Sequence, residues 1–284
     1  LFKKKKKMQK KKIMPEKFQR HFHSSQSEPQ DDVLNSNRNK KIIIVKPHTQ
    51  TISVNNNCKL NCSHCKGYFL KEMDKEIDYS YESFLISGGC DEKGKIPIDI
   101  KLLKKLKSQN KKINVHPGLV NEKTACLIGE YANVVSFDFI MDNNTIQNQY
   151  NLKNKTEQDI INSYLLLKKY CRVVPHLMIG FGNEKLGIDK LYKLGESEVC
   201  FIILKKYNKI ENNLVEPTIE KIEEILKYAR PKFKKISLGC MRPLNRKFEI
   251  DKIAIKYVDL IVNPHHNLTF EDFDVEYKDE CCCL

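Results

Sequence analysis

The feature that most limits the fold of this chain is an alternation of short β-branched runs and amphipathic stretches from residue 42 onward. Eight of these runs are apolar throughout, which is typical of parallel strands covered on both faces. They lie near Thr51–Val54, Phe84–Ser87, Ile113–His116, Val134–Ile140, Val173–Ile179, Val199–Leu204, Ile236–Gly239 and Asp259–Val262. Eight strands with helices between them predict an α/β fold, a (βα)8 TIM-type barrel or a slightly open variant of it.

The stretches between the predicted strands carry apolar residues at the i, i+3, i+4 spacing of a helix that buries one face. Three such stripes are Leu102, Leu103 and Leu106; Ile160, Ile161, Tyr164 and Leu167; and Ile222, Ile225, Leu226 and Ala229. Thr156 with Asp159 predicts a capping box, and Thr218 predicts a helix N-cap. A doubly wound open sheet is the alternative, but cysteines follow the first strand where that fold has a phosphate-binding glycine-rich turn.

Polar and cysteine residues fall repeatedly at the carboxyl ends of the predicted strands, where barrels of this kind bind their ligands. The residues in these positions are Cys58, Ser87 to Cys90, His116, Asp138, Gly180 and Cys240. Their common placement predicts a single active face.

The formal net charge of +14 comes mostly from the beginning of the chain. Residues 1–20 hold nine Lys and one Arg against Glu16, a net of +9, so the rest carries 14 − 9 = +5. We expect residues 1–41 to be a basic leader and 42–284 to be a barrel domain with a cysteine-rich tail. Three interpretations of this lysine-rich leader stay open. It is a solvated or spurious tail, a segment attracted to nucleic acid or membrane surfaces, or a presequence that uses Lys in place of Arg.

The chain has 11 cysteines but no apolar export segment near its start, and no apolar run approaches the ~20 residues that cross a bilayer. Clustered cysteines in a reducing compartment are more often metal ligands or catalysts than disulfides. We therefore expect an intracellular protein, in the cytoplasm or in an organelle if the leader is a targeting segment, with no membrane partner.

Three thiols lie on one short segment with the spacing Cys58-x3-Cys62-x2-Cys65. A [4Fe–4S] cluster takes one thiolate per iron, so three thiolates would leave one iron open to a substrate or cofactor. A structural zinc ion needs four ligands. His64 could be the fourth, but it lies inside the Cys62–Cys65 pair, which would strain the site. Unligated thiols are the third interpretation.

The triplet resembles the CxxxCxxC signature of radical S-adenosylmethionine (SAM) enzymes, which follows the first barrel strand in that superfamily. The resemblance implies that Cys58, Cys62 and Cys65 hold a [4Fe–4S] cluster whose open iron binds SAM. Reduction of the cluster then cleaves SAM to a 5′-deoxyadenosyl radical. The residues that the resemblance places near the cofactor are His64, Ser87, Gly88, Gly89, His116, Asp138, Ile179 and Gly180.

Four further segments resemble a biotin-synthase-related group that includes a subunit of the archaeal-type two-protein lipoyl synthase. They are Ser87 to Asp91, Asn114 to Val120, Ser237 to Pro243 and Cys281 to Leu284. The resemblance implies sulfur insertion into a protein-bound octanoyl chain. It also implies a lipoyl-carrier protein and a second radical SAM subunit as partners, and a ferredoxin or flavodoxin as electron donor.

Sulfur insertion would need an auxiliary iron–sulfur cluster as sulfur donor. The candidate ligands are Cys240, Cys281 and Cys282, with Cys90 or Cys283 as a further ligand. Cys126, Cys171 and Cys200 lie in apolar stretches and are expected to be ordinary buried residues.

Only 22 residues, 66–87, separate Cys65 from Gly88, so Lys71 to Ile77 is expected to form a shortened first helix. Such a barrel could keep its cluster and lose catalysis, which makes a degenerate iron–sulfur subunit an alternative. A zinc-containing basic nucleic-acid-binding protein is another alternative. Against it, residues 21–284 carry a net charge of only +5, without Trp and without interleaved aromatic and basic residues.

Overall fold

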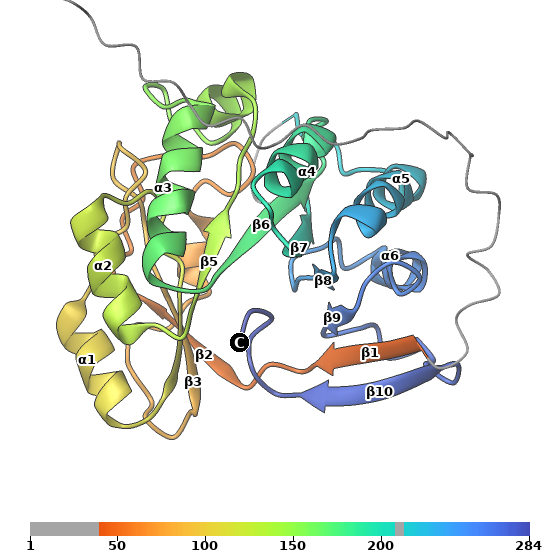
Figure 1. Ribbon diagram of the computed structural model, residues 1–284, viewed down its shortest axis with the longest axis horizontal. Coiled ribbons are helices and arrows are strands. Elements are labelled where there is room, and N and C mark those ends of the chain that lie inside the picture. The colour runs from red at the N-terminus through yellow and green to blue at the C-terminus, as the bar shows by residue number, and fades with distance from the viewer. Residues whose placement is uncertain (1–39, 208–212) are drawn as a thin grey trace, which may run out of the picture. The chain divides into compact units, whose positions relative to one another are not determined.

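The computed structural model describes residues 40–207 and 213–284, so nearly all of the expected leader lies outside the described residues. Ten parallel strands form one sheet in the order β10-β1-β9-β8-β7-β6-β5-β4-β3-β2 (Figure 1). The strands are β1 (Lys40–Val45), β2 (Thr49–Ser53), β3 (Ser83–Ser87), β4 (Lys112–Val115), β5 (Val134–Asp138), β6 (Val173–Ile179), β7 (Glu198–Ile203), β8 (Lys235–Leu238), β9 (Leu260–Val262) and β10 (Phe273–Lys278).

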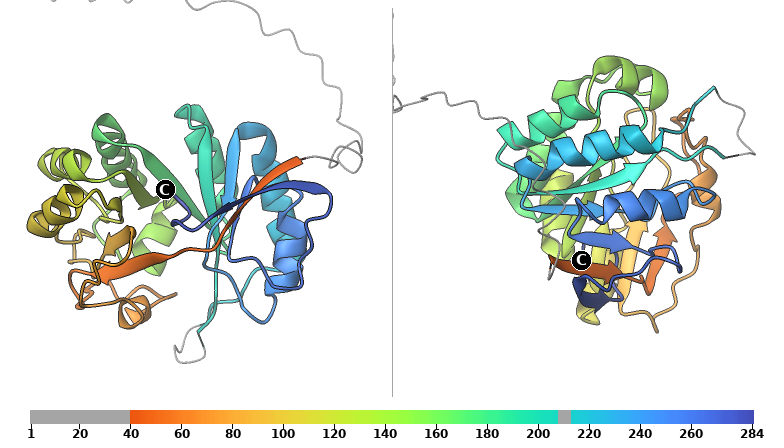
Figure 2. Two further views of the ribbon diagram at one scale, coloured as in Figure 1. Left: turned by 90° about the horizontal axis from the view of Figure 1, so that it is seen from below. Right: turned by 90° about the vertical axis from the view of Figure 1, so that its right-hand side faces the viewer.

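Six α-helices lie on the outer side of the curled sheet, and together the layers form an open TIM-type barrel (Figures 1 and 2). They are α1 (Ile100–Ser108), α2 (Glu122–Tyr131), α3 (Glu157–Tyr170), α4 (Glu184–Lys193), α5 (Ile219–Ala229) and α6 (Lys247–Ala254). The described residues also form three short turns: the 3-10 helices η2 (Tyr68–Lys71) and η4 (Arg230–Lys232), and the π-helix η3 (Thr145–Gln149). No helix within the described residues is long and apolar enough to span a membrane.

The apolar stripes predicted from the sequence are buried against the sheet in α1, α3 and α5. The two predicted caps are also confirmed. The Asp159 carboxylate accepts a hydrogen bond from the Thr156 backbone N–H at 3.0 Å, and the Thr218 hydroxyl accepts one from Lys221 N–H at 3.2 Å. Since each helix begins at its own cap and buries its own stripe, local sequence and tertiary packing agree.

Two strands were not among the eight predicted, and both lie at one end of the sheet. β1 pairs with β9 and β10, whereas β10 pairs only with β1. β10 reads Phe-Asp-Val-Glu-Tyr-Lys and none of its residues is fully buried. An edge strand of this composition has no continuous apolar run to mark it.

The expected helix at Lys71 to Ile77 is wrong, because a single 3-10 turn, η2, takes the place of a first α-helix. After this turn the chain returns to the outer edge of β2. There Ser53 N–H donates to Asp74 O at 3.0 Å, and Asp74 N–H donates to Thr51 O at 2.8 Å. The short connection thus covers an edge that would otherwise leave backbone groups unpaired.

The first two strands belong to opposite ends of the sheet, although only residues 46–48 separate them. β2 forms the edge beyond β3, and β1 lies beside β9 and β10 (Figure 2). Lys46 N–H donates to Lys278 O at 2.8 Å, which continues the β1–β10 ladder into this link. The 46–48 link therefore joins the two ends of the open barrel covalently.

Candidate functional site

The cysteine triplet lies on the loop that leaves the carboxyl end of β2, as the sequence predicted. The strand ends next to it hold this loop in place. Gly89 N–H donates to Asn55 O at 2.6 Å, the Asn55 side chain donates to Gly89 O at 3.1 Å, and Lys59 N–H donates to Cys90 O at 2.7 Å. The segment after β3 thus fixes the first half of the loop.

The loop packs so closely on this segment that position 89 has no room for a side chain. A Cβ on Gly89 would lie 2.6 Å from the Asn57 carbonyl and 2.6 Å from Cys58 N, and a Cβ on Gly88 would lie 3.0 Å from Asn55 N. These glycines were predicted to present bare backbone to SAM. In the structure, their lack of a side chain lets the cysteine loop approach β3.

A second set of contacts, from the end of η3 and the residues that follow it, holds the other half of the loop. The Asn151 side chain donates to Leu60 O at 2.5 Å, Ser63 N–H donates to Gln149 O at 2.8 Å, and the Cys62 thiol donates to Tyr150 O at 3.3 Å. Asn55 and Tyr150 were not identified from the sequence, since neither belongs to a motif.

The three thiols differ in how readily they ionise. A hydrogen bond from the Cys90 thiol, together with the Leu60 backbone N–H, outweighs partial burial and lowers the pKa of Cys58 to about 5. Burial raises the pKa of Cys62 and Cys65. Cys90 is the donor to Cys58, and its own pKa is raised. Cys58 is therefore prepared as a thiolate, the form that binds metal.

The spacing of the triplet distinguishes a cluster from a single ion. Ligands of a tetrahedral zinc ion lie roughly 3.5–3.8 Å apart, given Zn–S and Zn–N bonds of about 2.3 and 2.0–2.1 Å. Within the described residues, the groups of three potential ligand atoms that all lie within 4.8 Å of one another do not include Cys58, Cys62 and Cys65. Three thiols on one loop but farther apart suit an iron–sulfur cluster, in which each thiolate binds a different iron.

His64 lies inside the triplet and is 8% exposed. Its ring packs on Tyr150 at a centroid distance of 4.8 Å and on Phe181 at 5.8 Å. Burial lowers the pKa of His64 to about 4, so the ring is neutral at neutral pH. Its Nδ1 is buried and, among the described side chains, has no hydrogen-bond partner.

Three of the predicted cofactor residues form one polar row at the carboxyl ends of β3, β4 and β5. The Ser87 hydroxyl lies 3.2 Å from His116 Nδ1, and His116 Nε2 lies 3.5 Å from an Asp138 carboxylate oxygen. Burial opposes ionisation of Asp138, but His116, His176 and His64 together outweigh it and lower its pKa. Asp138 therefore carries a negative charge into the barrel.

Ile179 and Gly180, which were both predicted to lie near the cofactor, have different surroundings. Ile179 is fully buried. The side chain of Leu177 reaches Gly187 on α4. Because residues two apart in a strand share a face, the Ile179 side chain also faces the helices. Any contact of Ile179 with a ligand would have to use its backbone. Gly180 has a φ of +135°, and Glu184 accepts hydrogen bonds from the N–H groups of Gly180 and Gly182 at 2.7 and 2.9 Å.

The cysteines of the tail lie at the other end of the strands from the triplet. After β10 the chain turns inward and ends within the curve of the sheet (Figures 1 and 2). Cys281 and Cys283 are buried against Val134 and Val174, residues near the amino ends of β5 and β6. Cys281, Cys282 and Cys283 lie within 4.8 Å of one another.

Cys240, the third candidate ligand for an auxiliary cluster, is exposed and belongs to neither of the compact groups of ligand atoms found in the described residues. Of the cysteines expected to be ordinary buried residues, Cys126 is exposed on α2, which makes that expectation wrong, and Cys171 is half-buried. Cys200 is buried, but it lies beside His176 and Cys282 rather than among apolar side chains alone. The apolar sequence neighbourhood thus predicted the burial of Cys200 but not the exposure of Cys126.

A cavity of about 740 Å³ opens next to the triplet loop. Its lining includes Tyr68, whose N–H donates to Cys65 O at 2.7 Å, together with Tyr207 and Pro243. Lys205 and Lys206 add positive charge to the wall. The volume lies in the range of sites that bind small molecules and cofactors.

No family model and no curated protein matches the sequence. Among solved structures, methylornithine synthase matches with a TM-score of 0.52 at 15% identity, over 81% of this chain and 74% of that one. The protein anSMEcpe with bound AdoMet and a peptide matches with a TM-score of 0.48 at 12% identity, over 76% of this chain and 63% of that one. The chain shares the fold of methylornithine synthase. The open variant of a TIM-type barrel expected from the sequence is confirmed.

Proposed function

We propose that this protein is a radical SAM enzyme, which cleaves SAM reductively at a [4Fe–4S] cluster held by Cys58, Cys62 and Cys65. One observation carries the proposal. Three thiols leave the first strand of the predicted barrel on one anchored loop, not all within 4.8 Å of one another, in a chain with the fold of methylornithine synthase.

The residues around the triplet fit such a cluster. The lowered pKa of Cys58 favours the thiolate that would bind iron, and Cys90 supports that charge by donating a hydrogen bond. The neutral ring of His64 offers an unpaired nitrogen beside the thiols. The rings of Tyr150 and Phe181 pack on His64 and exclude water from this side.

When bound and reduced, the cluster supplies the electron that splits SAM into methionine and a 5′-deoxyadenosyl radical. The chain contributes binding, orientation and shielding. Asp138 keeps its negative charge at the carboxyl ends of the strands, which complements the positively charged sulfonium and amino groups of SAM. Ser87 and His116 fix the position of this carboxylate through the row described above.

The electron must come from another protein, for which a ferredoxin or flavodoxin is our candidate. Lys205 and Lys206 lie at the cavity beside the triplet loop. Their charge would steer an acidic electron carrier to this face, and the attraction would weaken as ionic strength rises.

The test is anaerobic reconstitution of the full chain with iron and sulfide, followed by incubation with SAM and a strong reductant. We expect 5′-deoxyadenosine to form, at roughly four irons per chain. Cys58→Ala should lose both iron and product. Cys126→Ala, which removes an exposed thiol on α2, should retain both. Absence of deoxyadenosine, or unchanged iron in Cys58→Ala, would refute the proposal.

Sulfur insertion in lipoyl synthesis is the narrower form of this proposal and rests on the resemblance alone. It would require an auxiliary cluster as sulfur donor, with Cys240, Cys281 and Cys282 as the candidate ligands, and an octanoylated lipoyl-carrier protein and second subunit as partners. Roughly eight irons per chain, with sulfur transferred to an octanoyl peptide, would support it.

A further inference from the structure

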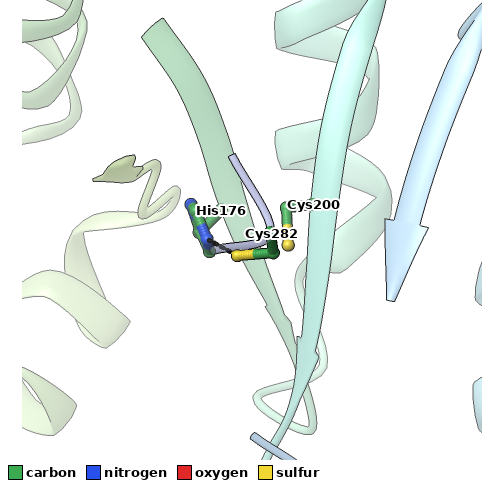
Figure 3. A group of neighbouring side chains, drawn as sticks. All are labelled: His176, Cys200 and Cys282. Carbon is green, nitrogen blue, oxygen red and sulfur yellow. Dashed lines mark hydrogen bonds between the residues drawn. The ribbon is translucent and has the colours of Figure 1, made fainter. Parts of the chain in front are cut away.

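The register of the sheet brings together two potential metal ligands that are distant in sequence. His176 on β6 and Cys200 on β7 are register partners in neighbouring parallel strands. Side chains at paired positions project from the same face of a sheet. Both therefore point to the face on which the C-terminal tail lies, as Figure 3 shows for His176, Cys200 and Cys282.

The tail brings two further thiols to this pair. Cys282 Sγ lies 3.9 Å from His176 Nε2, Cys283 Sγ lies 3.7 Å from the same nitrogen, and the two sulfurs are 3.5 Å apart. Cys200 Sγ lies within 4.8 Å of both His176 and Cys282. The first three distances are close to the roughly 3.5–3.8 Å edges of a tetrahedron of sulfur and nitrogen around zinc.

The imidazole is already oriented for coordination. His176 Nδ1 lies 3.1 Å from Val174 O, and a nitrogen that donates its proton to this carbonyl leaves Nε2 with a free lone pair. Metal-binding histidines have this arrangement almost without exception, since the outer hydrogen bond selects the tautomer and fixes the ring.

The tail that supplies the thiols is held in place by contacts with β4 and with the residue that precedes β6. Arg172 donates to Cys283 O at 2.5 Å, and the Asn114 side chain donates to Cys281 Sγ at 2.9 Å. Lys112 forms an ion pair with Glu280. Of the tail thiols, those of Cys282 and Cys283 contact His176 Nε2, and these are the two that we assign to a metal.

We infer that His176 Nε2 and the thiolates of Cys200 and Cys282, which lie within 4.8 Å of one another, bind one zinc-type divalent ion, and that Cys283, which contacts His176 and Cys282, turns its thiolate in as the fourth ligand. On binding, the three thiols release their protons to solvent, and the site carries a net charge of −1. The Cys3His ligand set is one of those used by closed, four-coordinate structural zinc sites. The ion pins the C-terminal tail to β6 and β7, near the amino ends of the strands and away from the triplet.

The experiment uses the full chain with Cys58, Cys62 and Cys65 all replaced by Ala, so that the triplet binds no metal. The protein is stripped with a chelator under anaerobic conditions and titrated with Co²⁺, whose spectrum reports tetrahedral thiolate coordination. We expect one Co²⁺ per chain, displaced by one Zn²⁺. Adding Cys282→Ser should weaken binding by more than ~100-fold, since even outer contacts of a metal ligand contribute 10–100-fold.

Cys126→Ser in the same background is the matched control, and it should keep full Co²⁺ binding. Circular dichroism checks that each variant is folded, and His176→Ala offers a second ligand change outside the tail. Binding that survives both Cys282→Ser and His176→Ala would overturn the inference, as would no stoichiometric binding at all. Iron and sulfide bound at these residues would overturn it too. None of these results depends on SAM cleavage.

Discussion

The molecule holds two groups of cysteines, and they differ in almost every respect. The triplet Cys58, Cys62 and Cys65 is contiguous in sequence and more widely spread in space, on a loop at the carboxyl end of a strand. The second group, His176 with Cys200, Cys282 and Cys283, is scattered along the chain and closer in space, toward the amino ends of the strands: the first three lie within 4.8 Å of one another, and Cys283 contacts two of them. The first is suited to a cluster of several metal ions and the second to one ion.

The difference shows that spacing along the chain and spacing in the fold carry separate information. A loop that binds a cluster can be encoded in eight consecutive residues, because each thiol needs its own iron and the cluster fills the space between them. A single ion draws its ligands within about 4 Å of one another, and in this chain only the sheet register and the path of the tail can do so.

The largest expected effect separates the two groups completely. Cys62→Ala removes a buried member of the triplet and should lower iron retention and deoxyadenosine formation by at least ~100-fold. Zinc content, measured on the same samples by mass spectrometry, should not change. A parallel loss of zinc would show that the two groups are coupled, and would break the comparison.

The second prediction concerns the tail group and stability. With free zinc at 100 times its dissociation constant, binding should stabilise the fold by about 2.7 kcal/mol. For a domain of this size the melting temperature should rise by about 5–10 °C. Calorimetry with and without a chelator measures the difference. In Cys282→Ser the chelator should have no effect, whereas in Cys62→Ala its effect should persist.

The third prediction concerns the backbone that positions the triplet. Gly89→Ala would place a Cβ 2.6 Å from the Asn57 carbonyl, so the loop must move. We expect the free energy of unfolding to fall by about 1–3 kcal/mol and the protein to lose iron. Gly195→Ala is the matched control, because its φ of +77° imposes a strain of about 1–2 kcal/mol with no atom within 4 Å. Equal iron content in the two variants would contradict this role for Gly89.

The smallest effect is expected for a reference substitution outside both cysteine groups. Asp159→Asn weakens the capping box of α3 and should reduce the free energy of unfolding by about 0.5 kcal/mol at pH 7, because solvent screens this partly exposed carboxylate. Burial opposes ionisation, but Lys155 and Thr156 hold the pKa of Asp159 below its usual 3.8.

The Asp159 contribution is therefore present above pH 3.8 and is lost as the pH falls through the lowered pKa. Denaturant titrations of both proteins across this range measure it, and the wild type and variant should converge in acid. Iron and zinc contents at neutral pH should equal those of the wild type. A change in either would mean that general destabilisation, and not ligand loss, governs metal content.

Much of the fold could be predicted from the sequence, because the central strands are buried on both faces and have continuous apolar runs. β10 could not, since an edge strand that is half exposed alternates apolar and charged residues. The first helix was predicted from the space available between Cys65 and Gly88. The chain uses that space to return to the edge of β2 at Asp74 instead.

The two sites differ in the same way. The triplet was evident from its spacing, whereas His176 had no signal and Cys200 suggested an ordinary buried thiol. Their pairing depends on the β6–β7 register, which no local pattern records. The glycines after β3 were identified as important, but their contact with Asn57 and Cys58 became clear only from the packing of the loop.

The 46–48 link also limits how far the molecule can open. Val45 and Thr49 are four residues apart, so an extended chain between them spans at most about 14 Å. An α-helix with its side chains measures about 10–12 Å across. However the sheet flexes, β1 and β2 cannot separate at this link by much more than one helix diameter.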